Sequence, residues 1–356
     1  MKKILHIVGN RPQFIKLAVL FNELAKDENI IQKIIHTGQH YSANMSDIFF
    51  SELNIPSPDI NFNIQNPSPP IFIGQAADAL YNYFVYEKDA VVFTYGDTNT
   101  TLAAALAAKR CGLSLIHFEA GVRTGDMTMP EETNRILTDR LSDVNYCCTR
   151  GNLDTMQREG FGESIKSELL LSGDLMLDAF LKIEPSGNKL TEHKKYIVCT
   201  IHREANLLNR ENLTNIISAL NTIHEEIPVV MPVHPHTLKR LAEYGLSPTF
   251  DVLEPLGYAD MKTLLSGCMY VITDSGGTSR EAYFLKKKSL VVMEKPFWPE
   301  IIEAGCSLQT NAEINAILEN FNKLEMLVSD FSAAIFGTGN AAENIHKHLT
   351  VYLANK

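Results

Sequence analysis

The sequence predicts an α/β protein with two doubly wound parallel sheets, and three observations support this. The chain has 356 residues, more than the roughly 250–300 at which one hydrophobic core stops growing. Short apolar runs alternate with segments of helical spacing, as expected for strands that take turns with helices. The alternation occurs in two consecutive sets, separated by a polar run at residues 184–195 that contains Pro185 and Gly187. We therefore expect two domains, each with its own sheet.

The first set begins with a strand at residues 3–8 and a helix at 12–26, in which Leu17, Leu20 and Leu24 share one face. Further strands are expected at 31–36, 90–93, 115–118 and 144–148, the last being the fifth and final strand of this sheet. Helices are expected at 45–53, 75–86, 101–109 and 131–142. The stretch 56–70 is rich in proline and predicts a surface loop.

The second set has predicted strands at 196–201, 229–233, 252–254, 269–273 and 290–293. Its clearest helix is 211–225, where apolar residues recur every three or four positions. A final helix at about 341–353 is expected to pack back on the first domain. The predicted domains are therefore residues 1–170 with 341–356, and residues 171–340.

Composition narrows the class of protein. A formal net charge of −10 argues against a nucleic-acid surface, which needs clustered excess Lys and Arg. No apolar window is long enough to span a membrane or to serve as a signal peptide. Six cysteines without a C-x-x-C pair are typical of reduced thiols, so we expect a cytoplasmic protein.

Residues 269–281 are the most informative stretch. An apolar strand is followed by Ser275, Gly276 and Gly277, and then by the start of a helix. Glycines allow close approach of the backbone, and the N–H groups of the new helix face the ligand, so the stretch predicts a phosphate site. The alternative is an ordinary loop with a serine cap.

Other predicted strands also end in polar groups, and in open α/β sheets ligands bind beyond these ends. The residues that follow the strands are Arg11, Lys16, His40, Asp97, Glu119, His202, Arg203, His234, Ser275, Gly276 and Gly277. Cations, carboxylates, histidines and a glycine-rich turn together suggest acid/base chemistry on an anionic ligand. The segment after the first strand lacks the second and third glycines of G-x-G-x-x-G, and no P-loop is present, so a nicotinamide cofactor is not supported.

Each candidate has a simpler alternative. Asp97 could cap the following helix, and Glu131 or Glu132 could only stabilise a helix dipole. Glu119 lies in a cramped setting where we expect a perturbed pKa, which favours a functional acid or base. Lys16 could belong to a solvated first turn.

The histidines also have alternatives. His202 could be a hydrogen-bonded core residue, or it could serve a phosphate or a leaving group. His234 and His236 raise a metal hypothesis that is weakly supported, because no carboxylate stands nearby at ligand spacing.

Together these motifs resemble the non-hydrolysing UDP-N-acetylglucosamine 2-epimerases. The matching blocks run in family order: Gly9-Asn10-Arg11-Pro12-Gln13-Phe14-Ile15-Lys16, Thr37-Gly38-Gln39-His40, Gly96-Asp97-Thr98-Asn99-Thr100-Thr101, His117-Phe118-Glu119-Ala120-Gly121-Val122-Arg123-Thr124, Pro130-Glu131-Glu132-Thr133-Asn134-Arg135, His202-Arg203-Glu204 and Thr273-Asp274-Ser275-Gly276-Gly277.

The resemblance implies a glycosyltransferase-B-like fold of two Rossmann-like domains with a UDP-sugar in the cleft, and a homodimer. It implies anti elimination of UDP followed by re-addition with inversion at C2, without metal or nicotinamide, for surface polysaccharide precursors. By position, the matches to catalytic residues are Asp97, Glu119, Glu131 and His202. The matches to nucleotide contacts are Arg11, Lys16, Ser275, Gly276, Gly277 and Glu281.

Two departures concern the substrate. Gln13 stands where the simpler branch has Glu, and Trp298 where it has Arg. Both look more like the branch that acts on UDP-2,3-diacetamido-2,3-dideoxy-glucuronate, so the choice between the two sugars stays open. Alternative functions are a glycosyltransferase of the same fold, a hydrolysing 2-epimerase and a UDP-sugar-binding regulator without turnover.

Overall fold

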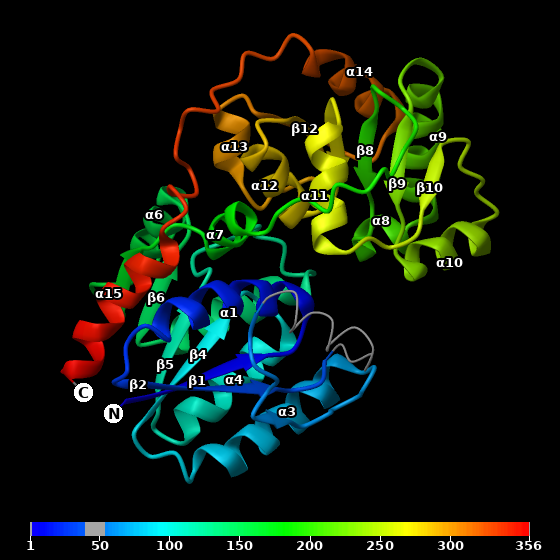
Figure 1. The fold of residues 1–356 in the computed structure, drawn as a ribbon. Coiled ribbons are helices and arrows are strands. Elements are labelled where there is room, and N and C mark those ends of the chain that lie inside the picture. Colours follow the sequence, from blue (N-terminus) through cyan, green and yellow to red (C-terminus); the bar gives the residue numbers. More distant parts are fainter. Residues whose placement is uncertain (1, 40–53, 356) are drawn as a thin grey trace. The chain divides into compact units, whose positions relative to one another are not determined.

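The computed structural model describes residues 2–39 and 54–355, and it divides into two compact units. The first comprises Met1–Leu181 with Ile335–Lys356, and the second Lys182–Ala334. Figure 1 shows both ribbons. His40 and the helix predicted at 45–53 lie outside the described residues.

The first unit is built on a parallel sheet whose described strands have the order β3-β2-β1-β4-β5-β6-β7. This is the strand order of a Rossmann-like sheet with an added edge strand. The strands are β1 (Lys2–Val8), β2 (Ile30–His36), β3 (Ile60–Asn61), β4 (Ala90–Tyr95), β5 (Ser114–Phe118), β6 (Val144–Cys147) and β7 (Glu168–Leu171). The helices are α1 (Arg11–Leu24), α3 (Pro69–Phe84), α4 (Asn99–Arg110), α5 (Pro130–Leu141), α6 (Arg150–Arg158), α7 (Leu175–Lys182) and α15 (Ala341–Ala354).

Two strands of this sheet were missed. The sheet does not end at residues 144–148, because β7 pairs with β6 in parallel register. The short strand β3 lies inside the predicted loop and pairs with β2. Helix α3 begins at Pro69 and not at residue 75, because prolines fit the first turn of a helix, where the N–H needs no partner within the helix.

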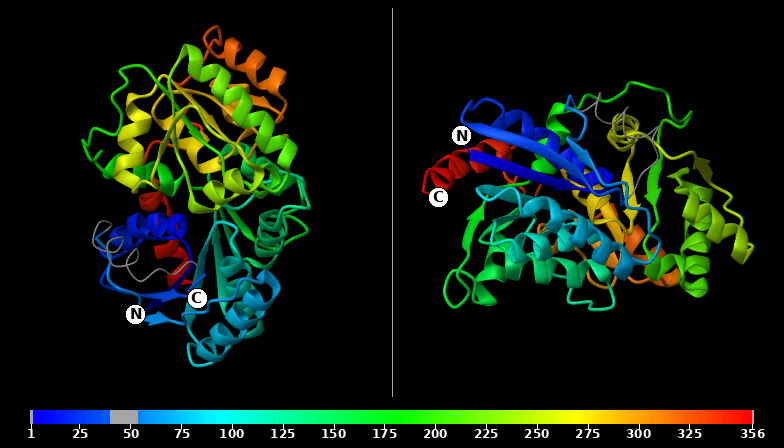
Figure 2. Two further views of the ribbon diagram at one scale, coloured as in Figure 1. Left: turned by 90° about the vertical axis from the view of Figure 1, so that its right-hand side faces the viewer. Right: turned by 90° about the horizontal axis from the view of Figure 1, so that it is seen from below.

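The C-terminal helix α15 packs beside α1 of the same unit, as Figure 2 shows. The buried carboxylate of Asp178 accepts hydrogen bonds from the backbone N–H groups of Ala341 and Ala342, at 3.1 and 2.8 Å. Tyr146 Oη lies 2.7 Å from His348 Nδ1. The first unit runs to Leu181, so it contains β7 and all of α7 except its last residue, beyond the predicted boundary at residue 170.

We expect Asp178→Ala to destabilise the first unit by about 2 kcal/mol. The substitution leaves two buried N–H groups at the start of α15 without an acceptor. Urea unfolding followed by far-UV circular dichroism measures the change. An unchanged unfolding midpoint would show that this carboxylate does not hold α15.

The second unit repeats the architecture. Its described strands have the order β10-β9-β8-β11-β12-β13. The strands are β8 (Ile197–Thr200), β9 (Val229–Pro232), β10 (Asp251–Leu253), β11 (Tyr270–Thr273), β12 (Lys288–Val292) and β13 (Ser307–Thr310). The helices are α8 (Glu204–Leu207), α9 (Arg210–Glu226), α10 (Pro235–Tyr244), α11 (Tyr258–Gly267), α12 (Gly276–Phe284), α13 (Pro299–Glu303) and α14 (Ile314–Leu324).

Core residues cover both faces of the second sheet. Along β8, Ile197 and Cys199 pack into the cluster that contains α9 and α14. Val198 packs into the opposite cluster with α11. This alternation is what a doubly wound sheet requires. The polar run at 184–195, expected to link the domains, lies within this unit: Asn188 Nδ2 donates to Asp260 Oδ1 at 2.8 Å.

A buried histidine makes the stability of the first unit depend on pH. His6 is fully buried, with Tyr95 Oη 2.7 Å from Nδ1 and Gln32 Oε1 3.0 Å from Nε2. Burial lowers the pKa of His6 to about 4, although the hydrogen bond with Gln32 acts in the opposite direction. The histidine of the unfolded chain takes up a proton as the pH falls below about 6.5, whereas His6 of the folded chain takes it up only near pH 4. The free energy of unfolding is therefore highest above pH 6.5 and falls toward pH 4.

We expect this histidine alone to account for a loss of about 3 kcal/mol in the free energy of unfolding between pH 6.5 and pH 4. Urea unfolding at several pH values in this window measures the slope. His6→Gln, which does not titrate, should have a shallower slope than the wild type. Equal slopes would contradict the assignment.

Candidate functional site

In both sheets the strand order reverses between two central strands, and ligands of open α/β sheets bind beyond the carboxyl ends of such strands. In the first unit these strands are β1 and β4. In the second unit they are β8 and β11. Among the described candidates, His234 follows β9 and Glu281 lies further along α12; the others follow these four strands or the neighbouring β5, or begin α5.

In the first unit Lys16 and Glu119 form an ion pair. Lys16 is 4% exposed and lies in α1, which follows β1, while Glu119 directly follows β5. The position of a Cβ atom on Gly96 would be 3.4 Å from Lys16 Nζ, so the turn after β4 borders the same pair. The structure therefore brings together residues from the ends of three neighbouring strands.

Glu119 has an uncommon backbone conformation, with φ of 76°. A residue other than glycine in this left-handed region carries strain of about 1–3 kcal/mol. The backbone N–H of Glu119 donates to the Tyr146 carbonyl at 3.1 Å, which holds the turn in place. Such strain is found most often where a side chain must be aimed at a ligand.

Asp97 does not cap the following helix, because Thr98 does so by accepting from Thr101 N. Asp97 instead pairs with Arg135 of α5, whose Nε lies 3.1 Å from Asp97 Oδ2. The other side of the guanidinium binds Glu132 at 2.8 Å. Arg135 is 1% exposed, so a buried cation fixes Asp97.

The two glutamates at the start of α5 have different surroundings. Glu132 is fully buried and accepts from the backbone N–H groups of Thr124 and Gly125, so it has a structural role. Glu131 is half-buried in the same first turn.

A buried network of hydrogen bonds and ion pairs is centred on Asp139, next to the turns that carry Asp97 and Glu119. Its carboxylate is 2.7 Å from His117 Nδ1 and 2.7 Å from Arg123. His117 Nε2 lies 2.7 Å from the carbonyl of Gly96, the residue before Asp97. Burial tends to raise the pKa of Asp139, but the hydrogen bond from His117 and the charges of His117 and Arg123 hold it below its usual value. The network fixes the turns after β4 and β5 relative to each other.

In the second unit His202 follows β8, and its side chain is 47% exposed, so the alternative of a core histidine is wrong. Its backbone N–H donates to Asp274, which follows β11, at 3.0 Å. Ser275 caps α12 by accepting from Thr278 N. Glu281 lies in α12 and is 9% exposed.

The two glycines of this turn have different functions. A Cβ atom on Gly276 would lie 2.9 Å from the ring of Phe297, so packing requires a glycine there. On Gly277 the corresponding Cβ would meet nothing closer than Ser275 Oγ at 3.6 Å. Gly277 therefore leaves the backbone open at the N-terminus of α12, as a phosphate site needs.

Comparisons with known proteins agree with this geometry. A family model described as UDP-N-acetylglucosamine 2-epimerase matches residues 22–350. The chain belongs to this family. A UDP-2,3-diacetamido-2,3-dideoxy-D-glucuronate 2-epimerase of Pseudomonas aeruginosa is 37% identical over 352 residues, which cover 98% of this chain and 99% of the relative.

Solved structures of family members have the same fold. Methanocaldococcus jannaschii UDP-GlcNAc 2-epimerase, in complex with UDP-GlcNAc and UDP, aligns with a TM-score of 0.89 at 33% identity, covering 98% of this chain and 99% of that one. The Neisseria meningitidis UDP-GlcNAc 2-epimerase bound to UDP-GlcNAc aligns with a TM-score of 0.86 at 27% identity, covering 98% and 100%. The predictions of the family, of two Rossmann-like sheets and of an isomerase of the 2-epimerase type are confirmed.

The departure from the simpler branch of the family at residue 13 has a structural explanation. Gln13 Oε1 accepts from Gly9 N at 2.7 Å, and Gln13 Nε2 donates to the Tyr95 carbonyl at 2.8 Å. An ionised glutamate has no hydrogen to donate to that carbonyl. Gln13 therefore joins the turn after β1 to the end of β4.

Trp298, the second departure, holds the first residue of α12 in place. It is 2% exposed, and its Nε1 donates to the Gly276 carbonyl at 2.8 Å. Arg280 of α12 lies over its ring, 5.0 Å from the centroid. Trp298 thus anchors the start of α12.

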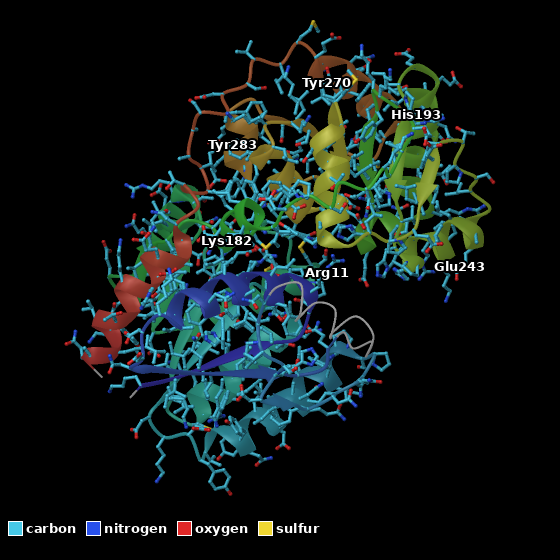
Figure 3. The ribbon with its side chains drawn as sticks, in the orientation of Figure 1. Arg11, Lys182, His193, Glu243, Tyr270 and Tyr283 are labelled. Carbon is cyan, nitrogen blue, oxygen red and sulfur yellow. The ribbon has the colours of Figure 1, made fainter. Side chains whose placement is uncertain are left out.

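Figure 3 labels Arg11, which is the first residue of α1.

His234 caps α10, since its Nδ1 accepts from His236 N at 3.3 Å. Within residues 2–39 and 54–355, no cluster of three or more His, Cys, Asp or Glu side chains could hold a metal ion. None of the helices in the described part of the chain is both long and apolar enough to cross a membrane.

Proposed function

We propose that this chain is a non-hydrolysing 2-epimerase that inverts C2 of a UDP-2-acetamido sugar. The observation that supports the proposal is the Lys16–Glu119 pair, which joins the helix after β1 to the end of β5 beside the switch point of the first unit. A carboxylate fixed in a strained turn beside a buried ammonium is positioned to exchange a proton with a ligand. Asp97 follows the adjacent strand β4 and is held by the buried guanidinium of Arg135, so it is a second candidate carboxylate.

The proposed reaction has two steps. In the first, a carboxylate removes the proton from C2, the electron pair of that C–H bond forms the C1=C2 double bond, and the C1–O bond breaks with its electrons leaving on UDP. In the second, a proton is delivered to C2 on the opposite face and the UDP oxygen bonds C1 again. We propose Asp97, Glu119 and Glu131 as the proton carriers.

The leaving diphosphate gains negative charge, which the protein must stabilise. Arg11 and Lys16 supply positive charge, and the open N-terminus of α12 supplies N–H groups and a favourable dipole. His202 is proposed to serve the leaving oxygen. Ser275, Gly276, Gly277 and Glu281 are proposed nucleotide contacts.

The proposed substrate is UDP-N-acetylglucosamine or its 2,3-diacetamido-glucuronate analogue, in the supply of precursors for surface polysaccharide. Incubation of the protein with each nucleotide sugar, followed by ³¹P and ¹H NMR, tests this. A new nucleotide sugar with inverted C2 and no free UDP supports the proposal and identifies the substrate. Free UDP with free sugar indicates the hydrolysing reaction, and no product from either nucleotide refutes an epimerase of these sugars.

We further propose a homodimer in the cytoplasm. The six cysteines form no disulfide with one another, which suits a reducing compartment. The exposed apolar side chains of Ile71 and Tyr81 in α3, and of Val85 just after it, are candidates for a contact with a second copy. Light scattering measures the mass in solution, and a monomer at micromolar concentration would contradict the dimer.

A further inference from the structure

We infer that Asp274 is a positioning residue that orients His202 for the reaction. The inference concerns the second unit alone and rests on the proposed function, in which His202 serves the leaving oxygen. Asp274 is fully buried and follows β11, while His202 follows the adjacent strand β8.

Both oxygens of the Asp274 carboxylate are used as acceptors. Oδ1 accepts from the backbone N–H of His202 at 3.0 Å. Oδ2 accepts from the backbone N–H of Arg203 at 2.9 Å and from Asn206 Nδ2 at 3.0 Å. The ring nitrogen Nδ1 of His202 lies 3.6 Å from Oδ1. One buried side chain therefore fixes the backbone turn that carries His202 and places a carboxylate oxygen within 3.6 Å of its ring.

This arrangement requires a carboxylate. An asparagine has one acceptor oxygen and one amide group that only donates. In either orientation of the amide, its hydrogens would point at the N–H groups of His202 or of Arg203. The turn that carries His202 would then have to move, and a displacement of about 1 Å can reduce a rate by about 100-fold.

The Ser275–Gly277 turn, the proposed phosphate site, is also held by hydrogen bonds that do not involve the Asp274 side chain. The effect of Asp274 on His202 can therefore be measured separately. Thr273 Oγ1 accepts from Ser275 N at 2.9 Å and lies 2.6 Å from Thr200 Oγ1. Trp298 holds the Gly276 carbonyl. Loss of the Asp274 carboxylate should therefore disturb His202 more than the Ser275–Gly277 turn.

A double-mutant cycle tests the inference. Asp274→Asn should lower kcat for epimerisation by about 100-fold while the Kd for UDP, measured by calorimetry, changes less than about 3-fold. In a His202→Ala background, the same substitution should lower kcat by no more than about 3-fold, because the residue through which it acts is gone. An equal loss in both backgrounds, or wild-type kcat in Asp274→Asn, would overturn the inference.

Asp178→Asn is the matched control. This buried carboxylate also accepts two backbone N–H groups, but it holds α15 of the first unit. It should lower stability with kcat unchanged. If Asp274→Asn does not fold, Asn206→Ala removes only one donor to the carboxylate, and we expect a smaller loss of kcat with the same sparing of UDP binding.

A readout that needs no turnover separates failure of the inference from failure of the proposed function. In ¹H–¹⁵N NMR spectra, Asp274→Asn should shift the amide signals of His202 and Arg203 more than that of Gly277. Larger shifts at Gly277 would show that Asp274 acts mainly on the Ser275–Gly277 turn, and would overturn its role toward His202. This result can be obtained even if the protein epimerises neither sugar.

Discussion

Glu119→Gln is expected to lower the rate of hydrogen exchange at C2 of the nucleotide sugar by at least about 1,000-fold, with UDP binding largely spared. An amide of nearly the same shape cannot take up the proton that a carboxylate accepts, and general acid–base groups contribute about 100- to 10,000-fold. The rate is measured by NMR with a nucleotide sugar in deuterated water, and UDP binding by calorimetry.

The ion pair with Lys16 makes a second measurement necessary. In Glu119→Gln the buried Lys16 ammonium loses its carboxylate, which should destabilise the first unit by about 3 kcal/mol. The double substitution Lys16→Met and Glu119→Gln removes this charge and should recover part of the stability, but none of the exchange. Wild-type exchange in the single variant would remove Glu119 from the mechanism.

Arg135→Leu is expected to lower the free energy of unfolding of the first unit by about 3–5 kcal/mol. The guanidinium is 1% exposed and is shared between Asp97 and Glu132, so its loss leaves carboxylates without their cation. Chemical denaturation followed by circular dichroism measures the change. Because Asp97 loses its support as well, we also expect the rate of C2 exchange to fall.

A second variant distinguishes the contribution of Glu132 to stability from the contribution of Asp97 to the exchange rate. Adding Glu132→Gln to Arg135→Leu removes the fully buried charge and should recover part of the stability without restoring exchange. An Arg135→Leu protein that unfolds at the same denaturant concentration as the wild type would show that the buried ion pairs contribute nothing.

The sequence identified which residues follow the strands, because strand ends can be found from local apolar runs. It missed the two-residue strand β3 as well as β7 and β13. β7, Glu168–Leu171, is a four-residue edge strand, and β13, Ser307–Thr310, has too few apolar residues to form a visible run. Both segments become strands because they pair with a neighbouring strand, β7 with β6 and β13 with β12.

The partners of the site residues could not be predicted. Lys16 and Glu119 are 103 positions apart, and Arg135 and Asp97 are 38 apart, so only the folded sheet brings them together. Local spacing left a helix cap open as an alternative interpretation of Asp97, although Thr98 is the cap. Likewise, nothing in the His202-Arg203-Glu204 block indicates that its backbone binds Asp274. The positive φ of Glu119 also has no local signal in the sequence, and the residue that its backbone N–H binds, Tyr146, lies in another strand.

The central claim is that the protein breaks and remakes the C2–H bond of a nucleotide sugar while UDP leaves and returns. Incubation with UDP-GlcNAc, and separately with the diacetamido-uronate nucleotide, in deuterated water tests it most directly. We predict that one deuterium appears at C2 of the nucleotide sugar, in both epimers at equilibrium, without free N-acetylmannosamine. Epimers that form with protium retained at C2, or no exchange with either nucleotide, would contradict the account.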